Sequence, residues 1–234
     1  LNDAALAGLI EQAFAPKRLK AVALSINSPG GSPTQSALIA ARIRRLAAER
    51  EVKVYAFCED VAASGGYWLA TAGDEIWADD NSIIGSIGVI YAGFGFQALL
   101  EKQGIERRVH TAGDSKSMLD PFKPENPEDV ARIKVLQEQI HQNFIRQVKD
   151  RRGGKLADKN LFTGDVWTSE GARGVGLIDG VGHLVPTMKS VFGDKVRLKV
   201  VSQKRSLFQR LGAPGVQDIA FAVEERALWS RYGL

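Results

Sequence analysis

The alternation of short apolar segments with amphipathic segments is the feature that most constrains how this chain folds. Residues 20–26 and 52–57 are apolar and lead into turns, which is typical of short buried strands. Residues 34–49, between them, are rich in Ala, Leu and Arg and favour a helix. Two strands separated by a helix pair in parallel, because the helix carries the chain back across the sheet. The pattern therefore predicts an α/β fold of repeated strand–helix units.

The same periodicities predict elements in the rest of the chain. Apolar residues recur at helical spacing over residues 6–14, before Pro16, and the longest helix is expected over residues 126–151. Additional strands are predicted at residues 76–78, 88–91 and 107–111. We expect residues 1–195 to form one domain and residues 196–234 to form a C-terminal extension.

One stretch of the chain resembles a membrane span in length. Residues 81–100 carry no charge, and about 20 apolar residues suffice for a helix to cross a bilayer. Four glycines lie within this stretch, however, and each costs a helix about 1 kcal/mol relative to alanine. We therefore expect a buried turn, a strand and the start of a helix.

The charge pattern limits the partners of the protein. The net charge is +4, and the basic clusters contain a single aromatic residue, Phe208, and no known nucleic-acid module. No nucleic-acid partner is therefore expected. An anionic membrane surface fits the basic C-terminal residues better, because Leu207, Phe208 and Leu211 lie among them.

Cysteine and histidine content limits the metal chemistry. A single cysteine, Cys58, cannot form an internal disulfide. The three histidines, His110, His141 and His183, are scattered along the chain. Neither they nor Cys58 have the sequence spacing of zinc ligands. No metal bound through such ligands is therefore expected, and no cofactor is expected either.

Two glycine-rich loops follow predicted strands, and the second places a serine where a strand ends and a helix begins. Ser64 lies between small residues in Ala62-Ala63-Ser64-Gly65-Gly66, as a sharp turn that exposes a nucleophile requires. The first loop, Pro29-Gly30-Gly31, can turn backbone N–H groups toward an oxyanion, because glycine permits the close approach. Ordinary turns and helix N-caps use the same residues, so a catalytic interpretation also requires a base.

Two kinds of base would suit Ser64. A histidine base would be His183, because His110 and His141 lie in charged surroundings, and the order Ser, Asp, His suits an esterase of the α/β-hydrolase type. A lysine base would be Lys116, which lies in the small polar turn Gly113-Asp114-Ser115-Lys116-Ser117. The residues by themselves leave both alternatives open.

Four motifs, in order, resemble those of the signal peptide peptidase A family of serine–lysine peptidases, and in particular its single-domain bacterial members. They are Asn27-Ser28-Pro29-Gly30-Gly31, Ala63-Ser64-Gly65-Gly66-Tyr67, Gly85-Ser86-Ile87-Gly88-Val89 and Gly113-Asp114-Ser115-Lys116-Ser117. Residues 162–179 are similar to that family as well, and to the wider crotonase and Clp-type fold. The resemblance covers roughly residues 1–195. It implies a crotonase/Clp-like α/β fold and a serine endopeptidase that cleaves apolar, extended peptides such as released signal peptides.

The resemblance implies a role for each motif. Ser64 would be the nucleophile and Lys116 the general base, and the N–H groups of Gly31 and Gly65 would form the oxyanion hole. Ser86 matches a hydroxyl that orients the lysine. An extended peptide substrate would pair with the strand that contains Ile87, Gly88 and Val89.

A lysine base makes a physical demand on its surroundings. A free lysine has a pKa near 10.4, so acting as a base at neutral pH requires a decrease of roughly 3 units. Burial supplies this decrease only if no carboxylate pairs with the amine. Asp114 and Asp120 are close to Lys116 in sequence, and we expect both to point away from its amine.

The resemblance also implies the surroundings in which the protein works. Family members begin with a membrane-spanning segment and a first strand, which we expect upstream of residue 1. They form homo-oligomers at the bacterial inner membrane, with the catalytic domain on the extracytoplasmic side. Two other interpretations stay open: another acyl-transfer enzyme, of crotonase or esterase type, and a non-catalytic scaffold that binds peptides at a membrane surface.

Overall fold

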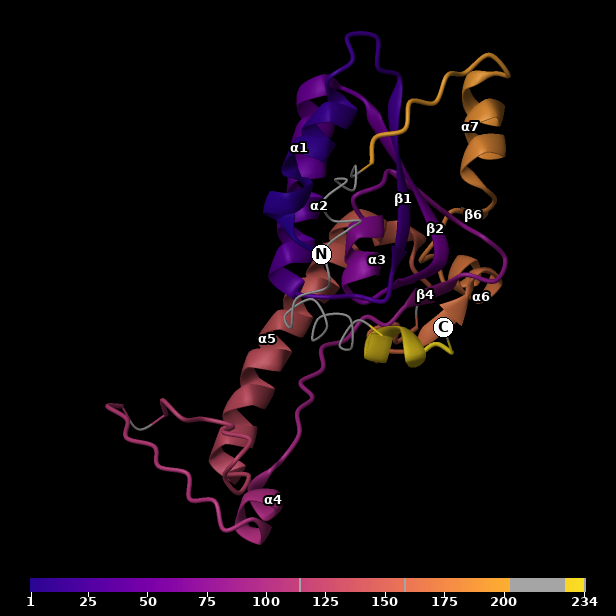
Figure 1. Cartoon of the computed structure of the whole chain (residues 1–234). Coiled ribbons are helices and arrows are strands. Elements are labelled where there is room, and N and C mark those ends of the chain that lie inside the picture. The colour runs from indigo at the N-terminus through magenta and orange to yellow at the C-terminus, as the bar shows by residue number, and fades with distance from the viewer. Residues whose placement is uncertain (114, 158, 203–225, 234) are drawn as a thin grey trace. The chain divides into compact units, whose positions relative to one another are not determined.

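The computed structural model describes residues 1–113, 115–157, 159–202 and 226–233 (Figure 1). The chain forms two compact units. The first combines Leu1–Gly88 with Phe144–Leu234, and the second is Val89–Asn143. The β-sheet belongs to the first unit, and helix α4 (Gln97–Lys102) belongs to the second. Helix α5 (Pro127–Arg152) begins in the second unit and ends in the first.

The sheet of the first unit is built around strand β2 (Lys53–Ala63). Three strands pair with β2 in parallel: β1 (Ala21–Ser28), β3 (Glu75–Ala78) and β4 (Ile83–Gly85). Two short strands extend the sheet: β6 (Gly180–Val181), parallel to β3, and β5 (Val166–Thr168), antiparallel to β4. Because β3 pairs with the first half of β2 and β4 with its last three residues, the end of β2 lies beside β4.

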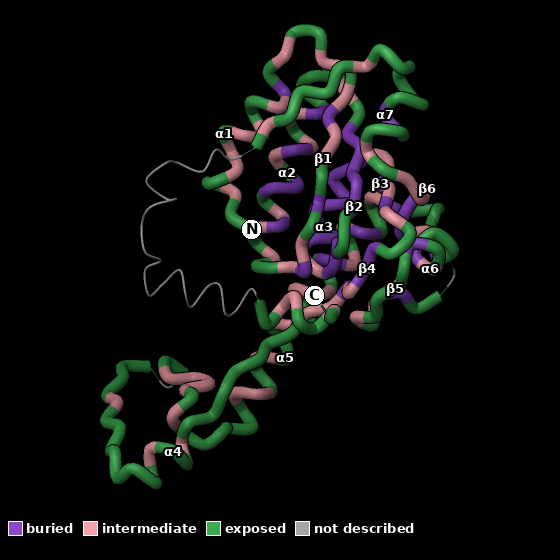
Figure 2. The backbone as a smooth tube through the Cα atoms, turned by 45° about the vertical axis from the view of Figure 1, so that its right-hand side comes forward, coloured by how far each residue is buried: buried purple, intermediate pink, exposed green. Residues whose placement is uncertain are grey.

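Side chains of β2 alternate between two hydrophobic clusters, as the two-residue period of a strand requires. Val54 and Ala56 belong to the larger cluster, which also contains side chains from α1 (Asp3–Phe14), α2 (Pro33–Arg50) and α3 (Gly65–Ala70). Tyr55 and Phe57 belong to the smaller cluster, with Met188 of α7 (Leu184–Phe192). The sheet is therefore covered on both faces, and Figure 2 shows the buried residues gathered along β2, α2 and α3.

Local capping signals set the starts of the first two helices. Helix α1 follows Asn2, whose side chain accepts a hydrogen bond from the Ala5 amide at 2.9 Å. Helix α2 follows Ser32 and begins with Pro33, a residue suited to the first turn because its missing N–H has no partner there. Both helices were predicted from the sequence at nearly these bounds, and both are confirmed.

Two of the predicted strands are wrong. Residues 88–91 and 107–111 form no strand, and no neighbouring strand pairs with either segment. A strand needs a partner for its backbone N–H and C=O groups, and apolar composition does not reveal whether one is available. The sequence also gave no indication of β5 or β6, which have only three and two residues.

The uncharged stretch at residues 81–100 differs in part from the prediction of a turn, a strand and the start of a helix. Its strand, β4, comes first, an irregular segment follows in place of the strand expected at 88–91, and the start of a helix, α4, is confirmed. In the part of the chain that the structure describes, no helix has the length and apolar character needed to cross a membrane.

The predicted fold class is confirmed. A mixed α/β domain with a mainly parallel sheet is the architecture expected of the crotonase/Clp-type fold. Helix α6 (Ser169–Gly174) and a short 3₁₀ turn (Gly153–Lys155) complete the elements of the first unit. The proposed boundary between residues 1–195 and 196–234 stays a prediction, and residues 203–225 of that extension lie outside the described residues.

Candidate active site

Ser64 occupies a strained turn between strand β2 and helix α3. Its backbone angles are φ 51° and ψ −121°, a conformation that residues other than glycine rarely adopt. Two backbone hydrogen bonds hold the turn: the Ser64 amide donates to the Gly85 carbonyl at 2.8 Å, and the Trp68 amide donates to the Ser64 carbonyl at 2.9 Å. Strain of this kind persists only where the surrounding structure enforces it, and it is characteristic of serines exposed as nucleophiles.

The side chain of Ser64 does not serve as a helix cap. Ser64 precedes the first residue of α3, yet its hydroxyl makes no capping hydrogen bond. Within the described residues the hydroxyl has no hydrogen-bond partner at all. The ordinary explanation for a serine at a helix start is therefore absent, and the hydroxyl is available for chemistry.

The glycines of both loops lie directly against Ser64. A Cβ atom at Gly30 would lie 3.1 Å from the Ser64 Cβ and 3.4 Å from its Oγ. A Cβ atom at Gly65 would lie 3.3 Å from the Gly31 nitrogen. Gly30 and Gly31 have φ values of 135° and 143°, which side chains disfavour. The structure thus brings Ser64, the predicted nucleophile, together with Gly31 and Gly65, whose amides are the predicted oxyanion hole.

Helix α3, which follows Ser64, is anchored through its buried tyrosine. The Tyr67 hydroxyl donates a hydrogen bond to the Leu177 carbonyl at 2.7 Å, and burial raises the pKa of this phenol. Two residues further along, Asp179 binds Arg152 at 2.7 Å and Lys155 at 2.6 Å. Burial alone would raise the pKa of Asp179, but hydrogen bonds from these cations and from the Ile76 amide outweigh it and lower the pKa. These contacts fix the segment on which the helix rests.

Ser86 follows Gly85, whose carbonyl accepts the hydrogen bond from the Ser64 amide. Like Ser64 it has a positive φ of 51°, and its own amide donates to the Asp165 carbonyl at 2.7 Å. Next to it, the Ile87 side chain is fully buried, so at this residue only the backbone can face a peptide. Ser86 is close to the nucleophile turn through Gly85. Its role toward a lysine, and the pairing of a substrate with Ile87, Gly88 and Val89, stay predictions.

Lys116 belongs to the second unit, in an exposed turn where its amide donates to the Gly113 carbonyl at 3.2 Å. Its amine makes no ion pair with any carboxylate of the described residues. Asp120 instead binds Arg107 at 3.0 Å, which agrees with the expectation that it points away from Lys116. Asp114 lies outside the described residues. The pairing of Ser64 with Lys116 therefore stays a prediction.

His183, the alternative base, is engaged elsewhere. Its Nε2 lies 2.7 Å from Oδ2 of Asp79, and its side chain is 69% exposed. The pKa of Asp79 is lowered to about 2, chiefly by the hydrogen bond from the Asn81 amide and also by His183. Asp79 follows Ala78, which pairs with Cys58, six residues before Ser64 along β2. Cys58 is in the middle of β2. Because six strand residues span about 20 Å, the Asp79–His183 pair lies beside the middle of this strand and away from Ser64.

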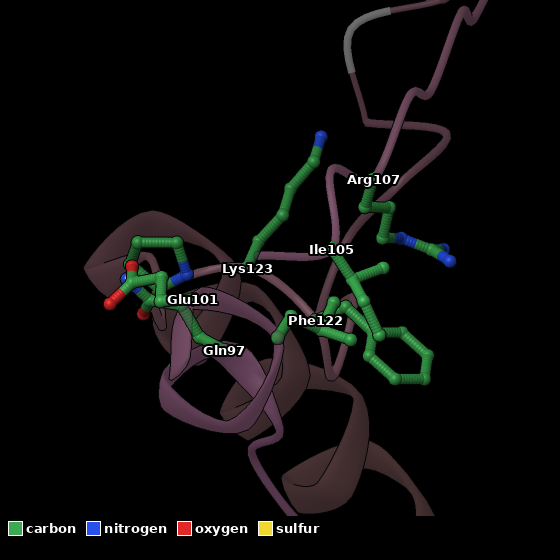
Figure 3. A pocket seen from close by; sticks show the side chains of 8 residues that line it. Gln97, Glu101, Ile105, Arg107, Phe122 and Lys123 are labelled. Atoms are coloured by element: carbon green, nitrogen blue, oxygen red, sulfur yellow. The ribbon is translucent and has the colours of Figure 1, made fainter. Parts of the chain in front are cut away.

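A small pocket lies in the second unit, between α4 and residues 105–107 and 122–124 (Figure 3). Its volume is about 240 Å³, and its lining includes Leu100, Ile105, Arg107 and Phe122. The Arg107 guanidinium lies 4.7 Å from the centre of the Phe122 ring, so it already has both an anionic and an aromatic partner. None of the predicted catalytic residues lines this pocket. Among the described residues, no group of three or more His, Cys, Asp and Glu side chains is placed to hold a metal ion.

A serine in a strained strand–helix turn, bordered by glycine amides on a parallel α/β sheet, is the arrangement that serine hydrolases use to expose a nucleophile. Residues 47–193 match the model of peptidase family S49. The chain belongs to this family of serine peptidases.

Individual relatives agree with this assignment over parts of their length. A protein of Enterococcus faecium, provisionally named signal peptide peptidase SppA, is 34% identical over 76% of this chain and 52% of its own length. The chloroplastic serine protease SPPA of Arabidopsis thaliana is 36% identical over 72% of this chain and 25% of its own. A Brucella melitensis protein named as the Na(+)/H(+) antiporter NhaA is 51% identical over the whole chain, which spans 34% of that protein. The chain thus spans from a quarter to about half the length of these relatives.

Proposed function

We propose that this chain is the catalytic part of a serine endopeptidase that cleaves extended, apolar peptides, with released signal peptides as its substrates. In this proposal Ser64 is the nucleophile, Lys116 is the general base, and the amides of Gly31 and Gly65 bind the oxyanion. The observation that carries the proposal is the strained conformation of Ser64, whose free hydroxyl lies beside the glycine amides. Membership of peptidase family S49 supports the peptidase chemistry.

The proposed reaction is an acyl transfer in two stages. The Ser64 Oγ attacks the carbonyl carbon of the peptide bond while the neutral amine of Lys116 accepts the hydroxyl proton. The carbonyl oxygen becomes an oxyanion between the two amides, and its collapse breaks the C–N bond as the lysine proton passes to the leaving amine. A water molecule then attacks the acyl-enzyme by the same route, which releases the acid and restores Ser64.

Desolvation of Lys116 is the main requirement of this proposal. The side chain is exposed in this chain, and a lysine amine becomes a base near neutral pH only when burial disfavours its charge. The working enzyme must therefore cover Lys116, either by a bound peptide or by a second copy of the chain. The homo-oligomer expected from the family resemblance would meet this requirement, and Ser86 would then orient the lysine.

The proposed place of action is the extracytoplasmic side of the bacterial inner membrane, where released signal peptides remain. The name of the Enterococcus faecium relative supports this substrate class. The antiporter name of the Brucella relative gives no reason to propose transport here, because two thirds of that protein have no counterpart in this chain.

The experiment that tests the proposal is cleavage of a quenched fluorescent peptide with an apolar, unfolded sequence. We expect the purified protein to cleave it, Ser64→Ala to lose activity by at least about 1,000-fold, and His183→Ala to stay within about threefold of the wild type. Circular dichroism would establish that each variant is folded. If folded His183→Ala is inert, the esterase-type base is correct instead. If the wild type binds the peptide without cutting it, the scaffold interpretation replaces the proposal.

A further inference from the structure

The hydroxyl of Ser28 is bound to the loop that carries the oxyanion amide. Ser28 is the last residue of β1, and its Oγ makes two hydrogen bonds with Gly30: it accepts from the Gly30 amide at 3.3 Å and donates to the Gly30 carbonyl at 3.2 Å. A serine hydroxyl has one proton to donate and lone pairs to accept, so this one residue uses both functions. Among the described residues, no other hydrogen bond holds the peptide group between Gly30 and Gly31.

The bond to the Gly30 carbonyl determines where the Gly31 amide points. The Gly30 carbonyl and the Gly31 N–H belong to one trans peptide group, in which C=O and N–H point in opposite directions. With the carbonyl directed at Ser28, the N–H is directed away from it. This peptide group lies against the residue that follows Ser64: a Gly65 Cβ would be 3.3 Å from the Gly31 nitrogen and 3.4 Å from the Gly30 carbonyl carbon. Ser28 therefore sets the orientation of a peptide group beside Ser64.

This peptide group has little else to keep it in place. It lies between two glycines, and a residue without Cβ allows a peptide group to rotate at low cost. Ser28 itself is fixed, because it pairs with Ala62 of β2. Its carbonyl oxygen also packs closely against Gly66, where an added Cβ atom would lie only 2.3 Å from that oxygen. The Ser28 hydroxyl thus fixes the Gly30–Gly31 peptide group relative to β2, the strand that leads into the Ser64 turn.

We infer that Ser28 is a positioning residue for the peptidase reaction, holding the Gly31 N–H toward the oxyanion. The inference rests on the proposed function and adds a residue to which neither the family resemblance nor the sequence motifs gave a role. Without the hydroxyl, the Gly30–Gly31 peptide rotates between two orientations, and only one of them presents the N–H to the developing charge. Ser28 acts on the transition state and not on the ground state, so its loss lowers kcat and leaves KM nearly unchanged.

The test compares Ser28→Ala with Ser25→Ala, a change three residues earlier on the same strand, where the hydroxyl binds Glu59 instead. We expect Ser28→Ala to lower kcat by roughly 10- to 100-fold with KM within about threefold, since removal of a whole oxyanion donor costs about 100- to 1,000-fold. Ser25→Ala is expected to match the wild type. A kcat for Ser28→Ala within twofold of the wild type would overturn the inference.

A second measurement separates positioning from general damage to the fold. A peptide aldehyde reacts reversibly with Ser64: Oγ bonds to the carbonyl carbon, the hydroxyl proton passes to the base, and the oxygen becomes an oxyanion in the hole. The matching peptide alcohol binds without this adduct. We expect Ser28→Ala to lose affinity for the aldehyde but not for the alcohol. Equal losses for both would contradict the inference, because partial unfolding weakens both ligands alike.

The two proposals can fail separately in this experiment. If the wild type cleaves the peptide through Ser64 and Ser28→Ala does so equally well, only the role of Ser28 is wrong. If the wild type neither cleaves the peptide nor prefers the aldehyde to the alcohol, the proposed function itself is wrong, and the role of Ser28 falls with it.

Discussion

Gly65, the residue after the proposed nucleophile Ser64, has no space for a side chain. A Cβ atom there would lie 2.5 Å from the Ser36 Oγ and 3.3 Å from the Gly31 nitrogen. Ser36 is fully buried, and its hydroxyl donates to the Ser32 carbonyl at 3.0 Å, so it is held in place. A methyl group at residue 65 would therefore push against both a buried hydroxyl and a proposed oxyanion donor.

We predict that Gly65→Ala loses about 100-fold or more in kcat, because displacement of the Gly31 amide removes oxyanion stabilisation. The measurement is peptide cleavage together with urea unfolding. Gly8→Ala is the matched control: a Cβ atom at Gly8 meets nothing within 4 Å, and alanine within a helix is favoured over glycine by roughly 0.5–1 kcal/mol. That control should keep full activity with slightly higher stability. Wild-type activity in Gly65→Ala would argue against the oxyanion role of this loop.

Sequence reasoning at the level of residues predicted the turn at Ser64 and missed the residues that support it. Ser64, Gly31 and Gly65 were recognisable because small residues clustered after predicted strands, and the structure brings the three together. Ser28 and Ser36 gave no such signal. A serine before Pro-Gly-Gly or near a helix start looks like any turn or cap residue, and only the three-dimensional contacts relate it to the site.

At the level of elements, the C-terminal end of α5 holds α3, the helix that follows Ser64. Trp68 of α3 stacks on Phe144 of α5, with ring centres 4.9 Å apart. The Arg151 guanidinium donates to the Thr71 carbonyl at 2.8 Å and to the Gly73 carbonyl at 3.0 Å. These carbonyls lie at the end of α3, where the helix itself provides no donors. Arg151 therefore completes the hydrogen bonding of α3 from a neighbouring helix.

We predict that Arg151→Ala lowers the free energy of unfolding by roughly 2–3 kcal/mol, because it leaves partly buried carbonyls without their charged donor. Arg45→Ala is the control: Arg45 pairs with Glu49 on an exposed helix face, where such pairs contribute about 0.3–0.5 kcal/mol. Urea unfolding of both variants measures the difference. Equal stability of the two variants would show that Arg151 does not anchor α3.

Elements with a strong local pattern were predictable, and elements that depend on distant partners were not. The helices α1, α2 and α5 and the strands β1 to β3 have periodic sequences with clear boundaries. Residues 88–91 and 107–111 have similarly apolar or extended sequences but find no strand to pair with. In contrast, β6 has two residues and exists only because β3 offers a free edge.

At the level of the whole molecule, the two residues of the proposed dyad belong to different units. Ser64 lies in the first and Lys116 in the second, and α5 is a single helix that takes part in both. The order of the motifs along the chain predicted this pair through family resemblance. The geometry of the dyad could not be predicted from the sequence. It depends on the folded chain and on the bound peptide or second copy of the chain that is proposed to cover Lys116.

The most direct test of the peptidase account is the rate of peptide cleavage by the wild type and by Lys116→Ala across pH 6 to 10. Lys102→Ala, a change of an exposed lysine in the same unit, serves as the control. The account predicts that the wild-type rate rises with pH, as catalysis by a general base requires, that folded Lys116→Ala is slower by at least about 100-fold, and that Lys102→Ala follows the wild type. Cleavage by Lys116→Ala at the wild-type rate would contradict the account and place the base elsewhere.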